Sequence, residues 1–141
     1  MTTATQAAAR YSGTFHGRTD QVRRGRQAIA AYLAGCPVRD DAILIGSELL
    51  TNAVLHSRSG RDGLVILRCE LNPGYVRLEV EDEGGPWRPR RRDDGRPHGL
   101  DVVAALAGPG NWGVQRTGDR SRIVWARLDL AAPGRTPGAV T

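Results

Sequence analysis

Three polar residues recur every four positions in the run Glu48-Leu-Leu-Thr-Asn52-Ala-Val-Leu-His56. At about 100° per residue, a helix places this carboxylate, carboxamide and imidazole within roughly 80° of one another. Apolar side chains surround the stripe, so we expect a helix that is apolar nearly all round and buried. An unpartnered buried carboxylate is costly. Glu48 and Asn52 are therefore candidates for contact with a polar ligand, whereas His56 is better explained as structural.

A second candidate lies where a strand is expected to end. Apolar and charged residues alternate from Val76 to Glu81, and strict alternation puts Asp82 on the apolar face. The glycines that follow, Gly84 and Gly85, would let a ligand approach the backbone closely. Asp82 could then accept a hydrogen bond from an amine. An ordinary aspartate in a tight turn is the alternative, and this pattern alone favours it.

A third candidate is Gly99, the first residue of an apolar helix expected over Gly99–Ala107. Unpaired amides at a helix start bind phosphate, and glycine leaves the approach open. The segment before it, 84–98, is rich in Gly, Pro, Arg and Asp, which predicts a long mobile loop of the kind that often serves as a lid. The cluster Arg88–Arg92 in this loop either grips phosphates or an acidic partner, or is a solvated run of charge.

Periodicity and turn residues predict the elements that position these candidates. We expect a strand over 11–15, helices over 19–33 and from Asp40 or Asp41 to about 57, and strands over 64–71, 75–81, 111–117 and 122–130. Runs of antiparallel strands with segregated helices predict an α+β two-layer sandwich. We place one domain at 11–130, between a disordered lead-in (1–10) and a disordered, Pro/Gly-rich tail (131–141).

Composition excludes several classes of protein. All 20 basic residues are arginine, so a Walker phosphate loop and Schiff-base chemistry, which need lysine, are excluded. The net charge of +5 permits nucleic-acid binding, but three Trp, three Tyr, one Phe and scattered arginines make that a minor alternative. Cys36 and Cys69 lack metal-ligand spacing and are expected to be reduced. With no apolar run of membrane-spanning length and no signal peptide, we expect a cytoplasmic protein without a membrane partner.

Together the motifs resemble the ATP-binding fold shared by histidine kinases, Hsp90, gyrase B and MutL, known as the GHKL or Bergerat fold. Within it, the chain is most similar to small anti-sigma factor serine kinases and their actinobacterial relatives. The matching stretches are Ser47–Ser57, Val80–Pro86, His98–Leu100, Asn111–Gly113 and Val124–Leu128. The resemblance spans about 11–130. It implies a mixed, mostly antiparallel sheet covered on one face by helices.

The resemblance also implies how ATP and Mg²⁺ would be held. Asn52 would give its side-chain oxygen to a Mg²⁺ ion that bridges the ATP phosphates, since this ion prefers hard oxygen ligands. Asp82 would accept a hydrogen bond from the exocyclic amine of adenine, and Gly84 would let the base lie close to the backbone. Gly99 and Leu100 would offer helix-start amides to the phosphates.

Glu48 would be the general base that takes a proton from the serine hydroxyl of a protein substrate. The implied function is a homodimeric serine kinase that phosphorylates a small antagonist protein and sequesters a sigma factor. The chain departs from the family pattern at three places, of which Pro97 and Ile123 favour the alternative of a nucleotide-binding or degenerate, non-catalytic partner-binding module. Pro97 replaces a glycine, Ile123 stands where the family has a threonine, and Pro86-Trp87 follows the glycine pair.

Overall fold

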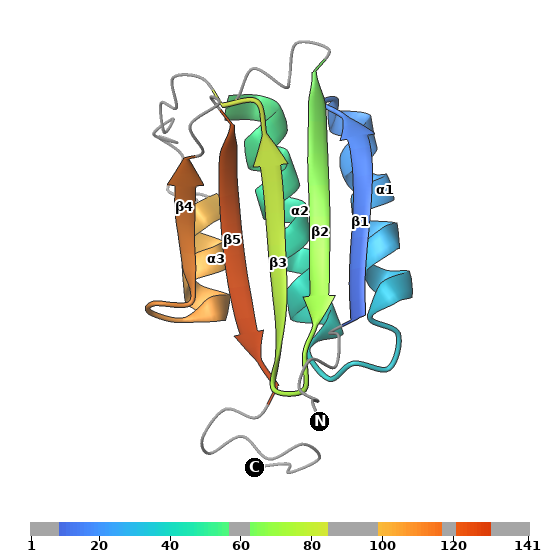
Figure 1. Ribbon diagram of the computed structural model, residues 1–141, viewed down its shortest axis with the longest axis vertical. Coiled ribbons are helices and arrows are strands. Elements are labelled where there is room, and N and C mark those ends of the chain that lie inside the picture. Colours follow the sequence, from blue (N-terminus) through green and yellow to red (C-terminus); the bar gives the residue numbers. More distant parts are fainter. Residues whose placement is uncertain (1–8, 57–62, 85–98, 117–120, 131–141) are drawn as a thin grey trace, which may run out of the picture.

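The computed structural model describes residues 9–56, 63–84, 99–116 and 121–130, which form a two-layer α+β sandwich (Figure 1). The elements are β1 (Ala9–His16), α1 (Thr19–Tyr32), α2 (Arg39–His56), β2 (Leu64–Leu71), β3 (Tyr75–Asp82), α3 (Gly99–Ala107), β4 (Trp112–Arg116) and β5 (Arg122–Asp129). The predicted fold class and every predicted element are confirmed. The lid expected over 84–98 lies outside the described residues except for Gly84, and so do its arginine cluster and Pro97. Residues 1–8, 57–62, 117–120 and 131–141 also lie outside.

The sheet has the strand order β1-β2-β3-β5-β4. All four pairs of neighbouring strands are antiparallel, so the described strands contain no parallel pair. The last strand, β5, lies between β3 and β4 rather than at an edge. This order pairs the end of β3 with the beginning of β5, and it brings together two residues that lie far apart in the sequence.

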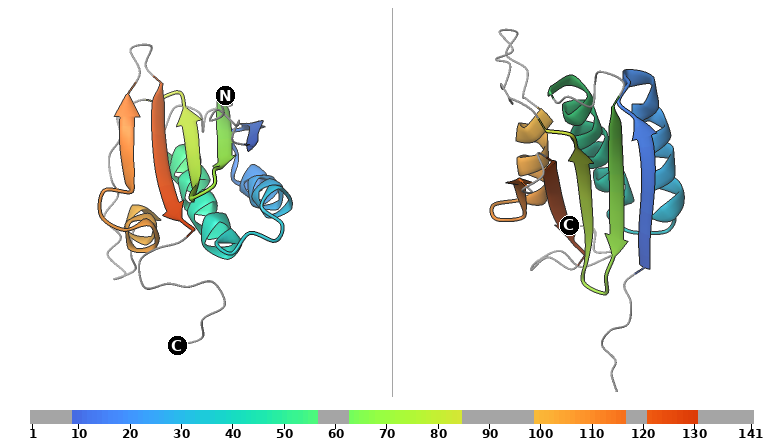
Figure 2. Two further views of the ribbon diagram at one scale, coloured as in Figure 1. Left: turned by 60° about the horizontal axis from the view of Figure 1, so that its bottom comes forward. Right: turned by 45° about the horizontal axis from the view of Figure 1, so that its top comes forward.

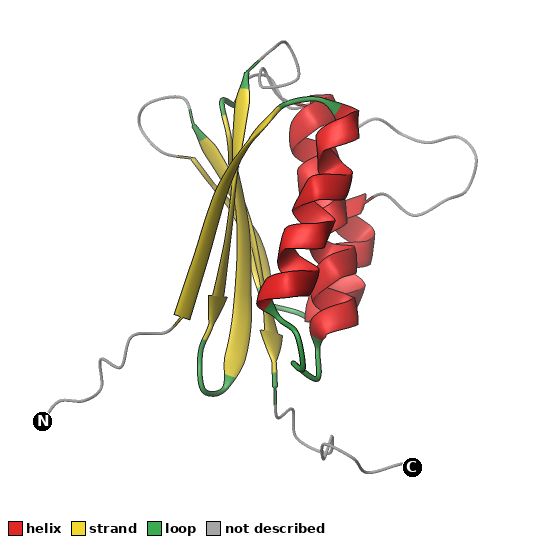
Figure 3. Ribbon diagram, turned by 90° about the vertical axis from the view of Figure 1, so that its right-hand side faces the viewer, coloured by secondary structure: helices red, strands yellow, loops and turns green. Residues whose placement is uncertain are grey.

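Helices cover one face of the sheet and leave the other open (Figure 3). Two glycines let α1 and α2 approach closely: a Cβ on Gly25 would meet Leu50, and one on Gly46 would meet Ile29. On the other side of α2 lies α3, as the end-on view shows (Figure 2). The helices therefore form one layer in the order α1, α2, α3.

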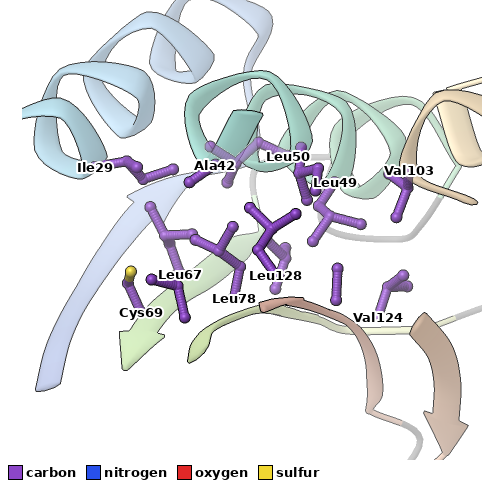
Figure 4. Packing of buried hydrophobic residues seen from close by; sticks show 14 of the residues in the cluster. Ile29, Ala42, Leu49, Leu50, Leu67, Cys69, Leu78, Val103, Val124 and Leu128 are labelled. Atoms are coloured by element: carbon purple, nitrogen blue, oxygen red, sulfur yellow. The ribbon is translucent and has the colours of Figure 1, made fainter. Parts of the chain in front are cut away.

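The core lies between this helical layer and the inner face of the sheet (Figure 4). Alternation along β2, β3 and β5 directs one side chain in two inward, as the charge pattern predicted for β3. The fully buried apolar residues include Ile29, Leu33, Ile45, Leu49, Leu67, Cys69, Leu78, Val80, Val103 and Ala126. No helix in the described part of the chain is long and apolar enough to cross a membrane.

The expectation that α2 is buried all round is wrong. Leu44 is 45% exposed and Leu55 is 54% exposed. A helix that has a sheet beneath it and one helix on each side still presents its outer side to solvent. These two leucines lie there, about 20° apart around the helix axis. α2 also begins at Arg39, so Asp40 and Asp41 lie in its first turn, where they favour the helix dipole, rather than at the N-cap.

The first strand begins two residues before the domain boundary expected at residue 11. Ala9 pairs with Leu71 and Arg10 with Glu70 across β1 and β2. The Arg10 Nε atom lies 3.4 Å from a Glu70 carboxylate oxygen. β2 is eight residues long, and β1 has the same length because it pairs with β2 along its whole length.

Candidate functional site

One flank of α2 carries the polar stripe that the sequence singled out. The opposite flank faces α1, through the contacts of Gly46 and Leu50 and a hydrogen bond from Arg26 to Ser47. At about 100° per residue, Glu48 and Asn52 lie roughly opposite those residues. Since α1 and α3 lie on either side of α2, the two polar side chains lie on the side of α3.

Asn52 has a buried amide nitrogen, Nδ2, without a hydrogen-bond partner among the described residues. Native proteins satisfy the great majority of their buried polar atoms, so each exception requires an explanation. A polar ligand beside this side chain would supply one. Glu48, one turn earlier, is half-buried on the same flank.

Asp82 is the last residue of β3 and lies on its inner face. It is 2% exposed, which confirms the inward position that alternation predicted. Its Oδ1 atom accepts a hydrogen bond of 2.7 Å from the backbone N–H of Gly84. Gly84 has φ of +69°, a left-handed conformation that glycine adopts without steric cost. The tight turn therefore fixes the orientation of the carboxylate.

Arg122 is a site residue that the sequence analysis missed. It is the first residue of β5 and lies directly opposite Asp82 in the antiparallel register. Its Nε and Nη2 atoms donate hydrogen bonds of 3.2 and 2.9 Å to Asp82 Oδ2. The two side chains are each 1% exposed. The signal was present in the sequence, because Arg122 extends the inward series Val124, Ala126 and Leu128, as Asp82 extends the inward series of β3.

The register also corrects the expectation for Ile123. Ile123 pairs with Glu81, and both residues belong to the outward-facing set of their strands. A side chain at position 123 therefore lies on the face away from Asp82. The residue of β5 that faces Asp82, and with it any ligand of that carboxylate, is Arg122. The absence of a threonine hydroxyl at position 123 therefore has no direct bearing on how a ligand binds at the inner face.

Opposing effects act on the protonation of Asp82. Burial raises the pKa of this carboxyl above its ordinary value, because a buried charge loses its hydration. The Gly84 amide, the Arg122 guanidinium and the charge of Arg116 each act to lower the pKa. Burial is the largest of these effects, so the pKa of Asp82 is raised overall, and Arg122 on the adjacent strand β5 and Arg116 on β4 offset it only in part.

Gly99 and Leu100 begin α3, as predicted. The first amides of a helix have no partner within it, and the start of α3 lies at the same end of the sandwich as the end of β3 (Figure 1). The Leu100 side chain packs against the core. Its backbone amide, rather than its side chain, is therefore the group available to a ligand. Val103, one turn further, is fully buried and anchors the helix beside α2.

The predicted site residues thus come from elements that meet at one end of the molecule. β3 ends there, β5 and α3 begin there, and α2 runs toward it (Figure 1). Within the described residues no three His, Cys, Asp or Glu side chains gather as a metal site. A divalent ion would therefore need ligand oxygens from a bound molecule beside Asn52. Phosphates supply such oxygens to Mg²⁺.

The family model of the histidine kinase-like ATPase domain matches residues 15–115. The chain belongs to this family. Membership in the histidine kinase-like ATPase family supports an ATP-binding regulatory function. Domains of this family bind ATP, generally together with Mg²⁺. The matched range contains Glu48, Asn52, Asp82, Gly84 and the start of α3, and it ends before Arg122. A comparison with curated proteins found no match.

Proposed function

We propose that this protein is an ATP-dependent regulator that transfers the γ-phosphate of ATP to a serine of a small antagonist protein and sequesters a sigma factor. The observation that carries the proposal is the α2 flank, where the buried Asn52 Nδ2 atom has no hydrogen-bond partner among the described residues and lies one turn from the half-buried Glu48. The resemblance to anti-sigma factor serine kinases supplies the class of partner. A homodimeric state and a cytoplasmic location are part of the same proposal.

In this proposal each residue of the candidate site has one role. Asn52 would hold a Mg²⁺ ion, which would supply positive charge to neutralise the phosphates. The first amides of α3, at Gly99 and Leu100, would donate hydrogen bonds to phosphate oxygens. Glu48 would accept the proton of the substrate serine hydroxyl. The serine oxygen would then attack the γ-phosphorus, and ADP would leave. Because phosphoryl transfer needs mainly positioning and neutralisation of charge, one base beside the bound ion is sufficient.

A second function is favoured by the Asp82–Arg122 pair. The carboxylate that would accept the adenine amine is already bound by a buried guanidinium. A protein whose nucleotide site is closed in this way would act by binding and sequestering its partner without phosphate transfer. Nucleic-acid binding has no such support on the outer face of the sheet. There the described arginines are paired with carboxylates at Glu70, Glu79, Glu81 and Asp129.

Calorimetry with ATP and Mg²⁺, followed by a transfer assay with a co-encoded antagonist, tests the proposal. Asn52→Ala should weaken binding about tenfold or more, because a ligand of the ion is lost. Glu48→Gln should bind ATP normally and lose transfer by a factor of about 10² to 10⁴, the usual contribution of a general base. Asn72→Ala, in the turn at the far end of β3, is the matched control and should change neither.

The outcomes separate the two functions. No ATP binding by the wild type would exclude the kinase. Binding without transfer to any antagonist would favour the partner-binding module. Transfer that survives in Glu48→Gln would show that Glu48 is not the base.

A further inference from the structure

Asp82 and Arg122 are the only charged residues that are buried in the part of the chain that the structure describes. They face each other across β3 and β5, 40 positions apart in the sequence. A fully buried ion pair is a poor source of stability, because desolvation of both groups offsets their attraction. Apolar residues of similar size would serve the core at least as well. The presence of the pair at the ligand end of the sandwich therefore points to a role in binding.

The hydrogen bonds of Asp82 fill the acceptor positions of Oδ2, the oxygen that faces β5. Each oxygen of a carboxylate accepts about two hydrogen bonds. Oδ2 already accepts two from Arg122, and Oδ1 accepts one from the Gly84 amide. The exocyclic amine of adenine is also a donor, and at Oδ2 it competes with Arg122 for the same acceptor positions. The guanidinium is the stronger competitor, since its hydrogen bonds are charge-assisted.

We propose that Arg122 is the specificity-determining residue of the nucleotide site: its guanidinium occupies Asp82 Oδ2, and the adenine amine reaches this oxygen only by exchange with it. This inference rests on the proposed ATP site. It predicts that the wild type binds ATP weakly and discriminates poorly between purine bases. The buried acceptor becomes selective for an amine only when Arg122 is moved away or replaced.

The test compares ATP with inosine triphosphate, whose base carries a carbonyl oxygen in place of the amine. Both are titrated with Mg²⁺ into the wild type and Arg122→Gln by calorimetry. In Arg122→Gln the Kd for ATP should fall about tenfold or more, because a neutral amide binds Asp82 more weakly than the guanidinium does and adenine displaces it at a lower cost. Inosine triphosphate should gain much less, because its carbonyl cannot donate to Asp82.

Arg127→Gln is the matched control. It makes the same change on the same strand, but Arg127 is exposed on the outer face, where it pairs with Asp129. It should leave both affinities unchanged. An unchanged or weaker ATP affinity in a folded Arg122→Gln protein would overturn the inference, and so would an equal gain for both nucleotides. If neither protein binds any nucleotide, the proposed ATP site fails together with the inference.

A second measurement covers the case in which Arg122→Gln does not fold, since loss of one partner leaves a buried carboxylate unpaired. The Nε–H signal of Arg122 in the wild type is followed by NMR during titration with ATP and Mg²⁺. A large shift and faster exchange with water at saturation would show that the base displaces the guanidinium. A signal that does not move while ATP binds would overturn the inference.

Discussion

At the scale of single residues, this site is built from polar groups placed where an apolar side chain is expected. Asp82 and Arg122 each extend the inward-facing series of a strand, and each is buried. Their positions are held by local geometry. The Gly84 amide binds Asp82 Oδ1 and leaves Oδ2 to face β5. The turn at Gly84 therefore decides how the carboxylate is presented to any ligand.

Gly84→Ala should lower the free energy of unfolding by about 1–2 kcal/mol, the cost of a left-handed conformation for a residue with a Cβ. It should also weaken ATP binding, because the turn that orients Asp82 is strained. Urea unfolding and calorimetry measure the two effects.

Two other glycines serve as controls for this prediction. Gly35 has φ of +83° with open space around its Cβ position, so Gly35→Ala should show the cost in stability without the effect on ATP. Gly74 has open space and no left-handed φ, so Gly74→Ala should show neither. A Gly84→Ala protein as stable as Gly74→Ala would contradict the argument.

At the scale of elements, the uncovered face of the sheet is stabilised by side chains that pair across its strands. Arg68 on β2 bonds both Glu79 and Glu81 on β3, and Arg77 bonds Glu79 as well. The Arg77 guanidinium also lies 5.4 Å from the centre of the Trp125 ring. Trp125 in turn covers Gly113 on β4, where a Cβ would come within 3.0 Å of the indole nitrogen. This network ties four strands together without a second layer of helices.

The network makes stability depend on pH through Glu79. Burial alone would raise the pKa of this carboxyl, but the hydrogen bonds from Arg77 and Arg68 outweigh burial and lower it. A carboxyl with a lowered pKa stabilises the folded state fully above its unfolded pKa, and this contribution is lost as the pH falls through the folded pKa.

Urea unfolding from pH 7 down to pH 3 tests this dependence. Glu79→Gln should be less stable than the wild type at pH 7 by about 1 kcal/mol, the upper range for partly exposed ion pairs. The difference should shrink as the pH falls through the acidic range. Glu70→Gln, which removes only the exposed pair with Arg10, should cost less. If the difference in the free energy of unfolding between Glu79→Gln and the wild type stayed constant down to pH 3, the lowered pKa of Glu79 would be refuted.

At the scale of the whole molecule, one core holds both layers together. Residues of β2, β3 and β5 meet those of all three helices in a single cluster (Figure 4). Cys69 lies on the inner face of β2 and is fully buried, whereas Cys36, between α1 and α2, is partly exposed. Burial raises the pKa of the Cys69 thiol to about 12. Its reaction with a thiol reagent therefore requires the sandwich to open.

Labelling with a thiol-specific reagent at pH 8 should modify Cys36 in the folded protein and leave Cys69 unmodified. In Cys36→Ser, labelling should be very slow in buffer and fast in denaturing urea, because the thiolate is scarce and enclosed until the core opens. In Cys69→Ala, the remaining Cys36 should be labelled at the same rate as in the wild type. Equal rates for Cys69 in buffer and in urea would show that the two layers separate easily.

The sequence by itself determined the elements, the inward position of Asp82 and the grouping of Glu48 with Asn52. These features follow from periods of about 2 and 3.6 residues, which the backbone geometry of strands and helices sets locally. The inward position of Arg122 is local in the same sense. Sequence reasoning applied the alternation argument to β3 and not to β5, so it missed this residue.

Only the tertiary structure decided which of these groups meet. The contact between Asp82 and Arg122 depends on the insertion of β5 beside β3 and on a register that joins residues 40 positions apart. Likewise, the exposure of Leu44 and the direction of Asn52 depend on which sides of α2 are covered by the sheet, α1 and α3. No local period contains this information, because it arises from packing between distant segments of the chain.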